Sequence, residues 1–226
     1  REDKLFLHTA GSVSIDVFQG MARHYGVFYP MQTFSRQKRV SFEEIPCFIE
    51  GSGEEETDAI EALASQLSHR VYRLSSEARK YLHLSAVFAC NFVNHCYAIS
   101  AELLEKHGIP FDVMLPLIDE TAAKVHQMLP KDAQTGPAVR YDENVIRAQS
   151  QLLKNNPLVK DIYDRMSMNI HRLSEEFNSF TNHKVPSSKY DKLRFKENQG
   201  TRLRCGRGVE RGNHSASPRR RADAHG

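Results

Sequence analysis

The segment from Ser75 to His107 contains neither glycine nor proline, and the next glycine along the chain is Gly108. Ser75, which shortly precedes Glu77 and Ala78, is typical of a helix start. The segment therefore predicts one helix far longer than the average of about 11–12 residues. Its apolar positions nearly encircle that helix: Leu82, Ala86, Ala89, Phe92, Val93, Cys96, Ile99 and Leu103. A helix that is apolar all round must be covered, and one small subunit offers little cover, so we expect a homodimer through residues 75–174.

Residues 1–74 have a different pattern, in which short apolar or β-branched runs alternate with segments of helical spacing. Strands are predicted at 4–9, 27–34, 46–50 and 71–74, and helices around 15–24 and at 54–69. After the long helix, further helices are predicted at 111–128, 142–153 and 158–173. The expected fold class is thus α/β followed by all-α, with a first domain at 1–74 and a helical domain at 75–176.

The charge of the chain is unevenly distributed. Residues 201–226 contain seven Arg against one Glu and one Asp, a net charge of +5, which leaves −2 of the total +3 for residues 1–200. A nucleic-acid-binding domain would carry its basic surface on the folded part, so nucleic acid is an unlikely partner. Because apolar periodicity fades from Phe177, we expect an irregular, disordered basic tail at 177–226.

Composition excludes several classes of protein. No apolar run approaches the roughly 20 residues that span a bilayer, and no secretory signal is recognisable at the start of the sequence. The four cysteines form no CxxC pair, which favours buried thiols in a reducing cytoplasm; they are Cys47, Cys90, Cys96 and Cys205. The histidines lack zinc-site spacing, so no metal is expected; those considered are His24, His69, His107, His126 and His171.

Several uncommon motifs occur in the order found in one known family. They are residues 8–12 (His-Thr-Ala-Gly-Ser), residues 29–35 (Tyr-Pro-Met-Gln-Thr-Phe-Ser), His83 with residues 86–88 and 91–92, residues 116–118 (Pro-Leu-Ile), and residues 135–138 with Arg140 and Asp142. Over about residues 5–174 the chain resembles the Rossmann-like, DUF2520-domain proteins, which are similar to the 6-phosphogluconate dehydrogenase group. The resemblance implies the C-terminal remnant of a Rossmann-like domain followed by a 6-phosphogluconate-dehydrogenase-like helical domain.

The same resemblance implies an NAD(P)-dependent oxidoreductase that acts on an unidentified small metabolite in a cleft between the two domains. The sequence contains no G-x-G-x-x-G motif, the signature of a pyrophosphate-binding turn. We therefore expect a fragment whose NADP or NAD binding needs a missing N-terminal segment. The alternative is a non-catalytic nucleotide or metabolite sensor, or a dimerisation scaffold, because a fold alone does not confer chemistry.

Candidate catalytic residues lie on the long helix. His83, Asn91 and His95 fall on one slowly drifting stripe of an α-helix. A helix that faces a nicotinamide site could use His83 as a proton donor or acceptor and Asn91 as a hydrogen-bond donor, with His95 as a substrate contact. The alternative is that these are satisfied polar residues inside a helical core.

Two further groups of residues are candidates for binding. The turn at 135–142 combines Thr135, Gly136 and Arg140, which suit a carboxylate or phosphate; alternatively, it is a structural loop in which Asp142 caps the next helix. His8 and Gln32 follow predicted strands at the edge where α/β sheets place ligands, so both are candidate cofactor contacts, although such residues are more often solvated or bonded to a turn.

Overall fold

A computed structural model describes residues 4–34 and 39–182 of the chain. Its first part is a four-stranded sheet of β1 (Leu5–His8), β2 (His24–Pro30), β3 (Cys47–Gly51) and β4 (Val71–Arg73) in the spatial order β1-β2-β3-β4. β1 and β2 are parallel, β2 and β3 antiparallel, and β3 and β4 parallel. The α/β class predicted for this part is confirmed, and the carboxyl ends of β1 and β2 share one edge of the sheet.

The helix α1 (Glu54–Ser65) packs on this sheet and forms its core. Ile60 and Ala64 on α1 are fully buried against Ile49 of β3. Three glutamates in the first turn of α1 stabilise its N-terminus through the helix dipole. This small core holds the strands in register and so fixes the sheet edge at which the site lies.

The helix predicted around residues 15–24 was wrong in extent. Only a short 3-10 helix forms, η1 (Ile15–Phe18), which the side chain of Ser14 caps. His24 instead pairs with Leu5 in the parallel ladder of β1 and β2. The last residue of the predicted helix therefore belongs to β2. This strand begins and ends earlier than the strand predicted at 27–34.

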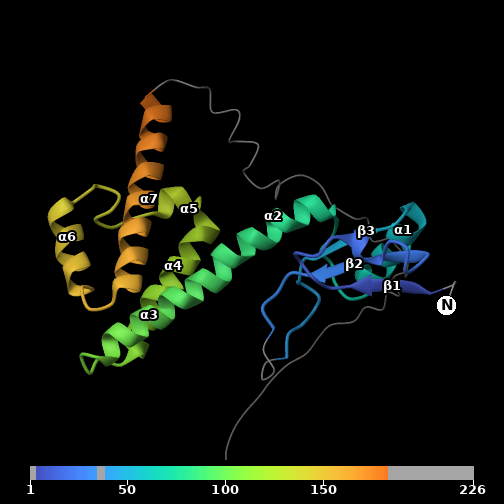
Figure 1. Ribbon diagram of the computed structural model, residues 1–226, viewed down its shortest axis with the longest axis horizontal. Coiled ribbons are helices and arrows are strands. Elements are labelled where there is room, and N and C mark those ends of the chain that lie inside the picture. Colours follow the sequence, from blue (N-terminus) through green and yellow to red (C-terminus); the bar gives the residue numbers. More distant parts are fainter. Residues whose placement is uncertain (1–3, 35–38, 183–226) are drawn as a thin grey trace, which may run out of the picture.

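The long helix is present, but it changes type in the middle. It consists of α2 (Ser76–Ala86), a π-helical segment η2 (Val87–Phe92) and α3 (Val93–Glu105). The Ser75 side chain accepts a hydrogen bond from the Ala78 N–H, as the predicted helix start requires. Figure 1 shows this helix running from the sheet to the remaining helices.

The long helix is not buried within one chain, contrary to the expectation of a core helix. No residue of η2 or α3 is buried, and Tyr81 and Phe88 are 72% and 61% exposed. The prediction of buried thiols was right for Cys47 but wrong for Cys90, which is exposed, and for the partly exposed Cys96; Cys205 lies outside the described residues. Large aromatic side chains that are exposed together in one chain are typical of a surface that another molecule covers.

The rest of the described chain is helical, as predicted. It contains η3 (Phe111–Met114), α4 (Leu115–Gln127), α5 (Pro130–Ala133), α6 (Glu143–Leu152) and α7 (Pro157–Asn182). The short α5 was not predicted, although a proline at the first helical position is a known helix start. The α7 helix continues past Leu173 to Asn182, so the prediction of an irregular segment was wrong for residues 177–182. The rest of that prediction, for residues 183–226, lies outside the described part of the chain. Among the helices of residues 4–34 and 39–182, none has the length and apolar character needed to span a membrane.

Candidate functional site

A cavity of about 550 Å³ lies between the end of β2 and the long helix. Its size is that of a small-molecule site, for which about 300–1,000 Å³ is usual. The loop after β2 contributes Gln32 and the helix contributes His83 and Asn91, so three of the predicted site residues line one cavity. The remaining lining residues are Tyr29, Met31, Thr33, Leu82, Ser85, Ala86, Ala89 and Cys90.

His83 is held in this cavity by a partner on the sheet. The Tyr29 hydroxyl lies 3.2 Å from His83 Nδ1, and the two rings meet edge to face with centroids 6.1 Å apart. A Cβ atom on Gly11 would lie 2.5 Å from His83 Nδ1 and 2.9 Å from Tyr29 Cζ, so only glycine leaves room for both rings. The loop after β1 therefore packs closely against both rings at Gly11.

The π-helical segment explains why His83 and Asn91 face the same cavity. In a regular α-helix, residues eight positions apart are separated by about 80° around the axis. A π turn bonds i to i+5 and absorbs one extra residue, so the pair acquires the relation of i to i+7, about 20° apart. Asn91 lies within η2, and π segments inside α-helices are frequent at functional sites.

A buried ion pair that the sequence reasoning missed anchors the start of the long helix to the sheet. The Arg79 side chain is 1% exposed, and its Nη1 donates to Glu50 Oε2 at 2.7 Å. Its Nη2 donates to the backbone oxygen of Val13, and Ser76 Oγ donates to the same Glu50 carboxylate. A signal was available, because Glu50 ends an otherwise apolar strand and a buried charge requires a partner.

His8 lies at the end of β1, beside this ion pair rather than in the cavity. Its Nδ1 accepts a hydrogen bond from the Ala10 N–H at 3.2 Å, and its Nε2 is buried without a partner in the described part of the chain. Burial, aided by the Arg79 charge, lowers the pKa of His8 below its usual value. The lowered pKa favours the neutral form of the ring.

The other predicted binding residues lie outside the cavity. His95 is exposed on α3 and does not line it. Thr135, Gly136 and Arg140 belong to the loop between α5 and α6, and none lines the cavity; their role stays a prediction. The alternative interpretation of this turn included Asp142 as the cap of the next helix. That cap is confirmed, since the Asp142 side chain accepts a hydrogen bond from the Val145 N–H at the start of α6.

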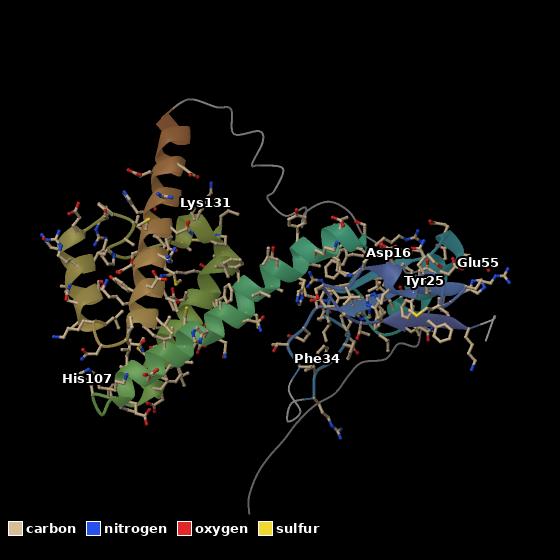
Figure 2. The ribbon with its side chains drawn as sticks, in the orientation of Figure 1. Asp16, Tyr25, Phe34, Glu55, His107 and Lys131 are labelled. Carbon is tan, nitrogen blue, oxygen red and sulfur yellow. The ribbon has the colours of Figure 1, made fainter. Side chains whose placement is uncertain are left out.

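The two ends of the long helix are far apart. His107, just beyond α3, lies on the opposite side of the molecule from Tyr25 on β2 (Figure 2). The cavity is formed near the sheet end of the helix, where α2 passes into η2. Within residues 4–34 and 39–182, no three His, Cys, Asp or Glu side chains come together in a way that could hold a metal ion.

A small α/β unit joined through one long helix to a helical domain, with a cavity where they meet, is the arrangement of a Rossmann-like protein with a helical second domain. The chain belongs to the DUF2520 family, described as a domain of unknown function, which matches residues 45–170. No curated protein matches the chain.

The solved structures that are similar to this chain include the following two. One is a protein of Bacteroides fragilis, named as a candidate NADP oxidoreductase, with 58% identity and a TM-score of 0.74 over 76% of this chain. The chain spans 66% of the length of that protein. The other is a protein of Thermotoga maritima, with 22% identity and a TM-score of 0.62, covering 77% of this chain and 70% of its own; at that identity it supports the fold alone.

Proposed function

We propose that this chain forms the substrate-binding part of an NAD(P)-dependent oxidoreductase that acts on a small metabolite with a carbonyl or hydroxyl group. The observation that carries the proposal is the cavity that brings Gln32, His83 and Asn91 together. It lies at the sheet edge where β1 and β2 end, the position at which α/β sheets bind ligands. The similarity to the Bacteroides fragilis protein supports the same class of reaction.

His83 and Asn91 have distinct roles in this proposal. His83 Nε2 makes no hydrogen bond within the described part of the chain, so protonated His83 can give its Nε2 proton to a substrate oxygen as a carbonyl becomes an alcohol. The ring left by this step holds its hydrogen on Nδ1, which can donate to the Tyr29 hydroxyl oxygen until a new proton binds at Nε2. Asn91 donates a hydrogen bond to the substrate and fixes its orientation. The coenzyme, when bound, supplies the hydride that the carbonyl carbon receives.

The described residues suit the nicotinamide end of a coenzyme better than its pyrophosphate. The cavity is apolar with a few polar groups, as a ring-binding site requires. The one Gly-x-Gly of the described residues, Gly51 and Gly53, precedes α1, whose first turn carries Glu54, Glu55 and Glu56. Three carboxylates would repel a pyrophosphate. We therefore expect weak or undetectable binding of NADPH and NADH to the chain of 226 residues by calorimetry; micromolar binding would contradict this.

The exposed apolar residues of the long helix support a second copy of the chain as partner. Leu84, Phe88 and Phe92 are each at least half exposed in one chain, and covering them would give the long helix the core position that its composition favours. We also propose a cytoplasmic location, because Cys47, Cys90 and Cys96 are all free thiols.

A non-catalytic metabolite sensor is the second candidate, because a cavity of this kind can bind a metabolite without any reaction. An activity screen separates the two. A longer protein that supplies a glycine-rich βαβ unit before this chain is assayed for NADPH and NADH oxidation with small aldehydes, ketones and 2-oxo acids. We expect His83→Ala and Asn91→Ala to lower turnover at least about tenfold, with His107→Ala, just beyond the C-terminal end of the same helix, as the control. Tight binding of a metabolite without turnover in any variant would favour the sensor.

A further inference from the structure

The hydrogen bond between Tyr29 and His83 decides which nitrogen of His83 can reach a ligand. Tyr29 Oη and His83 Nδ1 lie 3.2 Å apart, and each is the other's hydrogen-bond partner in the described part of the chain. The Nδ1 and Cγ edge of the ring is also the edge that a Cβ on Gly11 would contact. Both groups therefore occupy the same side of the imidazole, which leaves Nε2 for the cavity.

We propose that Tyr29 is a positioning residue that donates its phenolic hydrogen to His83 Nδ1, so that neutral His83 presents Nε2–H to the cavity. The cavity then recognises a substrate oxygen that accepts a hydrogen bond, such as a carbonyl or carboxylate oxygen. A ligand whose matching group is a protonated amine finds a donor facing a donor and is disfavoured. This inference deepens the proposed function and rests on it for the reaction, although not for the geometry.

Hydrogen-bond accounting favours this direction of donation. If Nδ1–H donated to Tyr29 instead, the phenolic hydrogen would lack an acceptor in the described structure. A donor without a hydrogen-bond partner in a partly buried site costs free energy, because it has lost its bonds to water. Burial raises the pKa of Tyr29, against a smaller opposite effect of Arg79, so the phenol keeps its hydrogen. When His83 is protonated, the same hydroxyl oxygen can accept from Nδ1–H. Before any proton is transferred to a substrate, Nε2 therefore carries a hydrogen whether His83 is neutral or protonated.

The experiment measures the tautomer of His83 by NMR on the full chain with 15N-labelled histidine side chains, without coenzyme or substrate. His83→Gln identifies the resonances of His83. We expect a bare Nδ1 and a protonated Nε2 in neutral His83. In Tyr29→Phe the minor Nδ1–H form should rise about twofold or more, because the hydrogen bond that selects the tautomer is gone. Tyr25→Phe, on the same strand with a ring contact to Phe18, is the matched control and should leave His83 unchanged.

Gly11→Ala provides an independent variant, because its Cβ would displace the His83 ring from Tyr29. It should reproduce the tautomer change of Tyr29→Phe while the phenol stays present. A protonated Nδ1 with a bare Nε2 in the wild-type chain would overturn the inference, as would an unchanged tautomer ratio in folded Tyr29→Phe. The tautomer as expected, combined with a longer protein that oxidises no coenzyme, would instead contradict the proposed function alone.

Discussion

Arg79 on α2 and Glu50 at the end of β3 form a buried ion pair, with Nη1 2.7 Å from Oε2. They lie 29 positions apart in the sequence and connect the sheet to the helix that carries His83. The geometry of the cavity depends on this connection, because Tyr29 belongs to the sheet and His83 to the helix.

Removing one member of this pair should destabilise the fold strongly. Arg79→Met leaves the carboxylate of Glu50, whose side chain is 19% exposed, without its cation. Breaking a fully buried pair in this way costs about 3–5 kcal/mol, and partial exposure of Glu50 should place the loss at the lower end of that range. Urea unfolding followed by circular dichroism measures the loss. Arg73→Met is the control, because Arg73 pairs with three exposed carboxylates on α1 and should lose much less. Equal losses in the two variants would show that the Arg79 pair is not the principal connection.

The stability of the chain should fall as the pH drops below about 6.5, with His8 as one cause. The folded-state pKa of His8 is lowered, mainly by burial, so the unfolded chain binds a proton more readily than the folded chain. The stability loss therefore begins near the unfolded pKa of about 6.5 and is complete below the folded pKa. Thermal unfolding at pH 7.5 and 5.5 should show a smaller pH dependence in His8→Gln than in wild type. An unchanged dependence would assign the effect to other groups, and His107→Gln serves as the control.

The chain should sediment at about twice its mass of 25.8 kDa at tens of micromolar. Phe88→Glu places a charge on the exposed aromatic surface of η2 and should shift the mass toward the monomer. Leu63→Glu, on an exposed position of α1 outside the helical domain, is the matched control and should stay dimeric. A wild-type monomer at these concentrations would refute the proposed assembly.

Asp142→Ala should lower stability by about 1 kcal/mol, because its carboxylate caps α6 by accepting from the Val145 N–H. Asp142→Asn should retain most of the stability, since asparagine is a comparable cap. Denaturant titration of the two variants decides the matter. Equal losses in both would mean that the charge, rather than the cap, stabilises this end of the helix.

Local patterns were sufficient to predict much of the fold. Ser75 and Asp142 identify helix starts because their side chains bond to backbone within three residues. His83, Asn91 and Gln32 were predicted as site residues, and the structure brings them into one cavity. Tyr29 and Arg79 were not, because their roles come from contacts 54 and 29 positions away, which no local period encodes. The π-helical segment was also missed, since an i to i+5 turn has no distinct composition.

The number of residues in η2 and their π-helical conformation together set the orientation of two surfaces of the molecule. If η2 became an ordinary α-helix with all six residues kept, everything beyond it would rotate by about 100° relative to the sheet. Asn91 would leave the cavity, and the apolar surface of α3 would turn away from the direction set by α2. Deleting one of these residues while the helix becomes α would instead keep both ends in their present orientation. A one-residue deletion should therefore be better tolerated than a substitution that straightens η2 at full length, because the same six residues set the orientation of the ligand pocket and that of the proposed subunit contact.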